Sequence, residues 1–196
     1  MVNLPPFTVG VAICVYRPSN SEYHPLQIST AMPASSADLF AFLDQLGISY
    51  HTVEHPPLFT VDQSRSLRGQ IPGGHTKNLF LKDKAGALYL VVALEDAVID
   101  LKALQRTLGA GRFSFGSAEL LRENLGVEAG SVTPFAVIND NRGKVAVILD
   151  AAMMEHEMLN YHPLVNTMTT AIAPGDLLSF LNATGHQPRI VPVSQG

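Results

Sequence analysis

The chain has 196 residues, of which 46% are hydrophobic and 15% are charged, and its formal net charge is −4. This length and composition suit one domain with a substantial core, and they exclude a disordered or fibrous chain. The negative net charge also excludes binding of nucleic acid through a broad basic face, so we expect no DNA partner and only a local contact with any RNA.

Cysteine content and the N-terminus both indicate an intracellular protein. Cys14 is the single cysteine, which excludes an internal disulfide framework and a multi-cysteine zinc site. The apolar run at 9–15 has no basic region before it and is much shorter than the roughly 20 residues of a membrane span. We therefore expect no signal peptide, no membrane segment and a cytoplasmic location.

The pattern of turns and apolar residues divides the chain into an N-terminal arm or tail at 1–31, rich in proline, and one domain at 32–196. Capping residues and apolar spacing predict the helices, and short apolar runs between turn residues predict the strands. The predicted helices cover 35–46, 61–68, 101–108, 118–125 and 174–181. The predicted strands cover 48–54, 76–82, 87–94, 113–115, 134–139, 144–149, short segments between 158 and 172, and 189–193.

Two pairs of these strands are predicted to form hairpins, 76–82 with 87–94 and 134–139 with 144–149. Strands and helices are interspersed, but hairpins outnumber βαβ units. The expected fold class is α/β of the α+β type, with a mixed, largely antiparallel sheet surrounded by helices.

The stretch at 72–83, read P-G-G-H-T-K-N-L-F-L-K-D, is the most suggestive of a ligand site. Gly73 and Gly74 permit a tight turn that a ligand can approach closely, and Lys77 and Asn78 follow at the start of a strand. A P-loop is excluded, because Gly74 is not followed by Lys-Ser/Thr and no helix begins there.

A zinc site at His51-Thr-Val-Glu-His55 is excluded on geometry, although the run matches the H-x-x-E-H pattern. The segment has strand character, so the two histidines would lie about 13 Å apart rather than one helical turn apart. We interpret them as polar side chains of a partly exposed strand, and we expect no metal.

Several candidate residues also have a purely structural interpretation. The basic residues clustered between 65 and 84 suit a solvated surface as well as a docking patch for a phosphate-bearing ligand. Lys77 by itself suits an exposed lysine, and His162 before Pro163 suits a turn. The basic residues in question are Arg65, Arg68, Lys77, Lys82 and Lys84.

Four motifs occur in order: H-P-P-L-F-T from His55, P-G-G-H-T-K-N-L-F-L-K-D from Pro72, G-S-V-T-P-F-A-V-I-N-D from Gly130 and N-Y-H-P-L-V-N-T-M-T-T from Asn160. Together they resemble the YbaK/ProX family of aminoacyl-tRNA deacylases, relatives of the editing domain of bacterial prolyl-tRNA synthetases. The resemblance covers about 33–193, and the second motif is closest to the free-standing ProX branch.

This resemblance implies a trans-editing hydrolase that deacylates mischarged tRNA(Pro), with alanyl-tRNA(Pro) as the substrate and proline excluded by size. The alternatives are a cysteinyl-tRNA(Pro) deacylase and a non-catalytic module that binds tRNA or a small ligand. The implied partners are the acceptor end of mischarged tRNA(Pro) and prolyl-tRNA synthetase, with no cofactor. The sequence does not indicate an oligomeric state.

The resemblance also assigns site residues. Lys77 and His162 match the catalytic positions, with Lys77 suited to the terminal phosphate or the developing oxyanion and His162 to positioning the substrate. Backbone N–H groups of the glycine turn and of Gly130-Ser131 are further expected donors. Val132, Phe135 and Thr169 are expected walls of a small pocket. The substrate-binding residues are Gly73, Gly74, Thr76, Asn78, Gly130, Ser131, Val132, Pro134 and Thr169.

Overall fold

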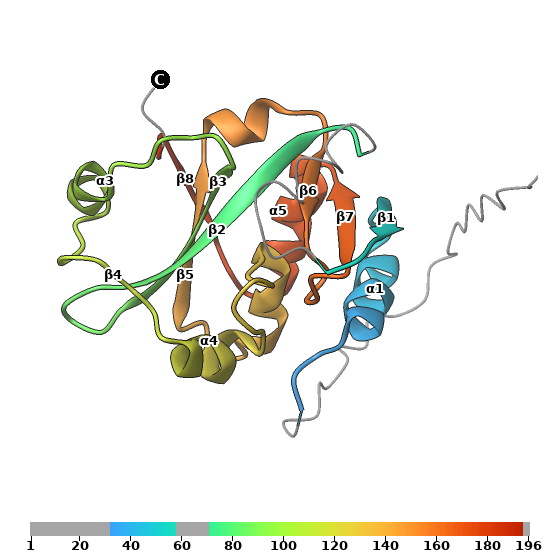
Figure 1. Ribbon diagram of the computed structural model, residues 1–196, viewed down its shortest axis with the longest axis horizontal. Coiled ribbons are helices and arrows are strands. Elements are labelled where there is room, and N and C mark those ends of the chain that lie inside the picture. The colour runs from blue at the N-terminus through green and yellow to red at the C-terminus, as the bar shows by residue number, and fades with distance from the viewer. Residues whose placement is uncertain (1–31, 58–70, 194–196) are drawn as a thin grey trace, which may run out of the picture.

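The computed structural model describes residues 32–57 and 71–193 (Figure 1). The arm predicted at 1–31 and the helix predicted at 61–68 lie outside these residues. Within them, the helices and strands follow the capping residues and apolar runs of the sequence closely.

The described strands form one eight-stranded sheet in the order β1-β7-β6-β2-β3-β5-β8, with β4 paired to the end of β2. Three neighbouring pairs are parallel, namely β2–β6, β3–β5 and β5–β8, and the other pairs are antiparallel. The predicted mixed sheet is therefore confirmed. The strands are β1 (Tyr50–Glu54), β2 (Gly74–Lys82), β3 (Leu88–Leu94), β4 (Ser114–Phe115), β5 (Val145–Asp150), β6 (Leu159–Tyr161), β7 (Met168–Ile172) and β8 (Arg189–Val191).

Side-chain caps explain where the helices begin. The Ser35 hydroxyl accepts a hydrogen bond from the backbone of Asp38, whose carboxylate accepts one in return, and Asp100 and Ser117 cap the next two helices. Pro174 occupies the first turn of the last helix. The helices are α1 (Ser36–Gln45), α3 (Leu101–Leu108), α4 (Ala118–Leu125) and α5 (Pro174–Ala183), with 3₁₀ helices η1 (Pro134–Asn139) and η2 (Ala152–Glu155).

The second predicted hairpin is wrong. The segment 134–139 is the 3₁₀ helix η1 rather than a strand, because Pro134 starts it and the Thr133 hydroxyl accepts a hydrogen bond from Phe135 N–H. Strand β5 pairs in parallel with β3 and β8 instead. Short apolar runs do not by themselves distinguish such a buried helix from a strand.

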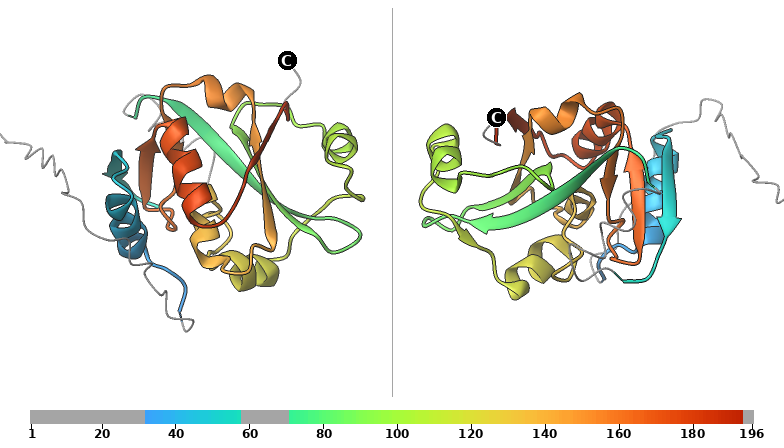
Figure 2. Two further views of the ribbon diagram at one scale, coloured as in Figure 1. Left: turned by 180° about the vertical axis from the view of Figure 1, so that it is seen from behind. Right: turned by 45° about the horizontal axis from the view of Figure 1, so that its top comes forward.

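The two faces of the sheet carry separate apolar clusters. The larger cluster joins the face that includes Phe80, Leu90 and Tyr161 to α1, α4 and α5, and Figure 2 shows α5 across this face in its left view. The smaller cluster joins Leu81 and Val91 to α3 and lies on the opposite face. Figure 1 shows α3 at one end of the sheet and β1 with α1 at the other.

Candidate active site

Polar side chains form a row across neighbouring strands, on the same face of the sheet as α3. His75 of β2 lies opposite Asn160 of β6, which in turn lies opposite Ala171 of β7. Side chains alternate along a strand, so Lys77, two residues after His75, and Thr169, two residues before Ala171, belong to this face. His162 follows β6 and continues the row. The polar row therefore consists of His75, Lys77, Asn160, His162 and Thr169. The parallel β2–β6 pair therefore brings the glycine-turn motif and the His162 motif side by side, 84 residues apart between Thr76 and Asn160 (Figure 1).

The ammonium group of Lys77 is held by the loop after β3. Its Nζ atom donates hydrogen bonds to the carbonyl oxygens of Glu95, at 3.0 Å, and of Ala97. The side chain is half-buried, so it is not an ordinary solvated lysine. An ammonium group has three donors, and these two bonds leave one N–H for a ligand.

The imidazole of His162 is held in one tautomer. Its Nδ1 atom lies 2.9 Å from the carbonyl oxygen of Met168, which can only accept, so Nδ1 carries the hydrogen and Nε2 is left as an acceptor. Burial lowers the pKa of His162 below its ordinary value, with a smaller contribution from His55 in the same direction, while the Met168 hydrogen bond opposes the shift. The neutral form with a free Nε2 lone pair is therefore favoured.

His55 is a site residue that the sequence analysis missed. It is buried, its Nδ1 atom lies 2.9 Å from the carbonyl oxygen of Pro56, and its Nε2 atom lies 2.9 Å from the Thr169 hydroxyl. Its ring centroid is 6.2 Å from that of His162. Thr169, predicted to bind substrate, thus fixes the His55 ring beside His162. A signal for this role was present, because His55 is the first residue of the H-P-P-L-F-T motif.

A pocket of about 470 Å³ opens at the ends of β1 and β7. His55 and Met168 line it, together with Glu54 and Thr167. Met168 therefore borders the pocket and also accepts the hydrogen bond from His162. Its volume lies in the range of small-molecule sites.

The loop that carries His162 is strained and anchored. Leu164 has a φ of 68°, which among the described residues makes it the only non-glycine residue with positive φ. Its N–H donates to the His162 carbonyl oxygen at 2.9 Å, and the Ser36 hydroxyl of α1 donates to the neighbouring Pro163 carbonyl at 2.5 Å. Such backbone strain costs about 1–3 kcal/mol and is concentrated at functional sites.

The glycine turn packs tightly against β6. Gly73 has a φ of 112°, and a Cβ atom there would lie 2.8 Å from the carbonyl oxygen of Met158. The N–H of Gly74 donates to that same oxygen at 2.9 Å, and the Thr76 hydroxyl donates to the Asn160 carbonyl at 2.8 Å. The N–H of Gly74 is therefore already used by the fold, contrary to the expectation that this turn offers it to an oxyanion.

The remaining predicted residues belong to the opposite face or to its core. Asn78 alternates with Lys77, and its Oδ1 atom is buried without a hydrogen-bond partner. In the Gly130–Pro134 loop, Ser131 N–H already donates to Glu128 at 3.0 Å, and Val132 packs against the larger apolar cluster. Phe135 is completely buried between Tyr161 and Phe180, so in this structure it is a core residue rather than a pocket wall. Pro134 is buried at the start of η1, and Gly130 has a φ of 95°.

The histidines of the H-x-x-E-H run do not form a metal site. The run lies in strand β1, His51 is exposed, and both ring nitrogens of His55 are engaged as described above. No group of three or more His, Cys, Asp or Glu residues within 32–57 and 71–193 is placed to hold a metal ion.

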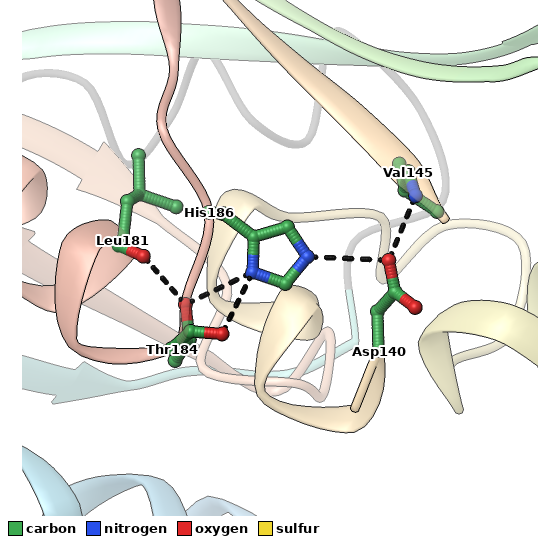
Figure 3. Close-up of polar contacts among 5 residues, drawn as sticks. All are labelled: Asp140, Val145, Leu181, Thr184 and His186. Atoms are coloured by element: carbon green, nitrogen blue, oxygen red, sulfur yellow. Dashed lines mark hydrogen bonds and ion pairs between the residues drawn. The ribbon is translucent and has the colours of Figure 1, made fainter. Parts of the chain in front are cut away.

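A second histidine cluster, shown in Figure 3, is structural. The Nε2 atom of His186 lies 3.2 Å from the Asp140 carboxylate, and its Nδ1 atom faces the carbonyl and hydroxyl oxygens of Thr184 at 3.1 and 3.2 Å. Although the order Thr-His-Asp resembles a catalytic triad, the Thr184 hydroxyl donates to Leu181 at 2.8 Å, and His186 and Asp140 are buried. The cluster ties the end of α5 to the turn before β5.

Comparison with known proteins identifies the family. The aminoacyl-tRNA editing domain family matches residues 55–180, which include the whole polar row. The chain belongs to this family. The YbaK/ProX resemblance is thus confirmed, and the protein is an aminoacyl-tRNA deacylase, so an entirely non-catalytic module is set aside.

Two relatives of this chain are matched over nearly their whole length. The prolyl-tRNA synthetase associated domain-containing protein 1 of Bos taurus is 39% identical over 166 residues, which is 80% of this chain and 96% of that protein. The prolyl-tRNA editing protein ProX of Acetoanaerobium sticklandii is 36% identical over 149 residues, covering 76% of this chain and 91% of that protein.

Solved structures share the fold of this family member. The hypothetical protein APE2540 superposes with a TM-score of 0.65 at 20% identity, covering 80% of this chain and 99% of that one. A candidate trans-editing enzyme for prolyl tRNA synthetase gives 0.64 at 22% identity, covering 83% and 99%. None of the described helices is both long and apolar enough to cross a membrane.

Proposed function

We propose that this deacylase acts in trans on mischarged tRNA(Pro), and that alanyl-tRNA(Pro) is its substrate. Two sets of similarities support this substrate class. The ProX relative is named a prolyl-tRNA editing protein, and the Bos taurus relative is named for a domain associated with prolyl-tRNA synthetase. The second sequence motif, at 72–83, also resembles the ProX branch.

The observation that carries the mechanism is the complementary polarity of Lys77 and His162 in one polar row. Lys77 retains one N–H donor after its two bonds to carbonyl oxygens. His162 retains one acceptor, because Nδ1 is committed to Met168. A donor and an acceptor on one face suit an ester that must be polarised at its carbonyl and attacked by water.

In the proposed reaction, water adds to the ester carbonyl carbon and negative charge develops on the carbonyl oxygen. The free N–H of Lys77 donates to that oxygen. Collapse of the tetrahedral intermediate breaks the bond to the ribose oxygen, which gains a proton, and free amino acid and tRNA are released. His162 Nε2 accepts a hydrogen bond from the water or from the neighbouring ribose hydroxyl and so positions the reacting groups.

Selection of alanine over proline would be a matter of size. A pocket built for proline rejects the smaller alanine weakly, since each missing methylene is worth about 1–3 kcal/mol, whereas a second, smaller pocket admits only the smaller substrate. Thr169, in the polar row, is the proposed wall, whereas Val132 packs against the larger apolar cluster on the opposite face. Phe135 has no such role.

Only the acceptor end of the tRNA is proposed to bind this domain. The net charge of −4 argues against a broad basic contact surface, and Lys77 is engaged with backbone carbonyls. Prolyl-tRNA synthetase is the proposed protein partner, since it produces the mischarged tRNA. Co-purification of the two proteins with and without tRNA(Pro) tests this association.

The deciding experiment incubates the purified protein with alanyl-, cysteinyl- and prolyl-tRNA(Pro) and measures the amino acid released. Release of alanine alone is the expected result. Release of cysteine alone assigns the protein to the cysteinyl alternative, and release of proline contradicts size exclusion. Retention of all three amino acids on the tRNA contradicts the tRNA(Pro) assignment.

A further inference from the structure

Asn160 holds the two halves of the active site together. It lies in the middle of β6, opposite His75, and only 4% of it is exposed. Its Nδ2 atom donates to the carbonyl oxygens of Pro72 at 3.2 Å and Gly74 at 3.5 Å, and the backbone carbonyl oxygen of Asn160 accepts from the Thr76 hydroxyl. Each of these contacts joins the glycine turn to the strand that leads into His162.

The Oδ1 atom of Asn160, by contrast, is buried and has no hydrogen-bond partner. The orientation of the amide is fixed, because two carbonyl oxygens face Nδ2 and a flipped amide would place oxygen against oxygen. A buried acceptor without a donor costs about 1–3 kcal/mol. Within the described residues, Asn78 Oδ1 is the only other side-chain atom of this kind, and it lies on β2, the strand paired with β6. The unpaired acceptors are thus confined to the strands of the site.

The substrate supplies a donor that matches Asn160. In an alanyl ester, the carbonyl and ester oxygens only accept hydrogen bonds, and the α-ammonium group is the only donor of the aminoacyl moiety. Lys77 provides a donor for the carbonyl oxygen, so an acceptor on the same face is needed for the ammonium group. A charge-assisted bond between an ammonium group and an amide oxygen is stronger than a neutral one.

We propose that Asn160 Oδ1 binds the α-ammonium group of the aminoacyl moiety, two residues before His162 and on the face that carries Lys77. This proposal rests on the proposed function. Oδ1 is shielded from water in this structure, so binding includes a small shift of the Gly73–Gly74 turn. The 3.5 Å contact from Nδ2 to Gly74 is the weaker of the two side-chain bonds that hold this turn.

The test compares alanyl-tRNA(Pro) with propionyl-tRNA(Pro), an ester that lacks only the α-amino group. The rate ratio of the two esters is measured for the wild type and for Asn160→Leu, which has a side chain of similar size without Oδ1. Differences in intrinsic ester reactivity are the same for both proteins and cancel in the comparison. We expect the preference for the alanyl ester to fall about tenfold in Asn160→Leu, as loss of one charge-assisted hydrogen bond predicts.

Two further variants separate binding of the ammonium group from a structural role. Asn160→Asp keeps an oxygen acceptor while removing the donors to Pro72 and Gly74, and we expect it to retain the preference for the alanyl ester even if both rates fall. Asn160→Ser replaces Asn160→Leu in the comparison if thermal melting shows that the leucine variant is unfolded, and the same loss of preference is expected.

An unchanged ratio in a folded variant that lacks Oδ1, or loss of the preference in Asn160→Asp, overturns the role of Asn160. Those outcomes leave the proposed function intact if the wild type hydrolyses alanyl-tRNA(Pro). Failure of the wild type to hydrolyse it overturns the proposed function, and the role of Asn160 with it.

Discussion

The imidazole rings of His55 and His162 lie 6.2 Å apart between centroids, and each has a ring nitrogen bonded to a neighbouring residue of β7, Thr169 or Met168. The two rings are therefore positioned by one strand. A hydroxyl and a backbone carbonyl, rather than a carboxylate, hold them, so the His162 ring is not stabilised as an imidazolium by a negative charge.

This environment predicts a specific pH dependence for His162. Its pKa in the folded protein is below the ordinary value of 6.5, mainly because the ring is buried, so below pH 6.5 the unfolded chain binds more protons. The free energy of unfolding should fall as the pH decreases from 6.5 through the folded-state pKa. Chemical denaturation at several pH values should show a shallower fall in His162→Gln. Identical slopes in the two proteins would contradict the lowered pKa.

Deacylation should depend on pH in the same direction. Protonation of Nε2 removes the acceptor, so the rate should remain level down to about pH 6.5 and decline only below it. Single-turnover rates with alanyl-tRNA(Pro) measure this profile. A rate that rises as His162 becomes protonated would show that the imidazolium is the active form.

Replacement of Lys77 by methionine should abolish most of the activity. The variant keeps the length of the side chain but removes the donor to the oxyanion, and loss of one such donor typically lowers the rate by about 10²–10³-fold. It also leaves the carbonyls of Glu95 and Ala97 without this partner, so a lower melting temperature is expected. Lys84→Met, at an exposed lysine of the β2–β3 turn, is the matched control and should retain wild-type rates. Equal rates in the two variants would remove Lys77 from the mechanism.

Thr169 and its neighbour Thr170 offer a comparison between the two faces of β7. Thr169→Val removes the hydroxyl bonded to His55, and Thr170→Val removes a hydroxyl that lies 2.8 Å from that of Thr52 on the other face. Each loss should cost about 1–3 kcal/mol in the free energy of unfolding. Only Thr169→Val should also slow deacylation, and Thr169→Ser should restore the rate. A similar loss of activity in both valine variants would indicate a general effect of stability.

Alanine substitutions at Gly73 and Gly130 distinguish the cost of backbone strain from the cost of close packing. Both have positive φ, 112° and 95°, but a Cβ atom would meet Met158 and Asn160 at position 73 and nothing within 4 Å at position 130. Gly73→Ala should therefore destabilise the protein more than Gly130→Ala, as measured by thermal melting, and should displace the Asn160 amide. Equal destabilisation would mean that the turn relaxes freely away from β6.

Removal of the buried His186–Asp140 pair should lower the stability of the protein without lowering the deacylation rate. Asp140 Oδ2 accepts from Val145 N–H at 2.7 Å as well as from His186, so Asp140→Ala leaves two buried donors unpaired. Each buried donor left unpaired costs about 1–3 kcal/mol. At a temperature where the variant remains folded, its deacylation rate should equal that of the wild type. A selective loss of activity would give this cluster a catalytic role.

Local patterns predicted the parts of the fold that depend on local interactions. Ser35, Asp100 and Ser117 cap helices, and the turn at 83–86 joins β2 to β3, as their sequences indicate. The segment 134–139 was misassigned because its apolar run fits a strand and its 3₁₀ conformation depends on Pro134 and burial against the core. The parallel pairing of β5 with β3 has no local signature, since its hydrogen bonds join segments far apart in the chain.

The residues of the candidate site divide in the same way, into those that local patterns predict and those that depend on contacts between distant segments. Lys77, His162 and Thr169 could be predicted from motifs, and their sharing of one face follows from strand alternation once the β2–β6 register is known. His55 was missed because its burial depends on β7, where Thr169 supplies its partner. Asn160 was missed because a partnerless oxygen is visible only in three dimensions.

The parallel β2–β6 pair also has a consequence for the order of events during synthesis and folding. Asn160 contacts Pro72 across 88 positions of sequence, and β7, which fixes both histidine rings, follows it. Contacts between such distant segments form slowly, because a long loop must close before they add stability. A ribosome-bound fragment that ends before residue 160 can contain β2 and Lys77 but cannot form the β2–β6 pair. Hydrolytic capability should therefore arise abruptly, late in chain elongation, rather than grow in proportion to folded structure.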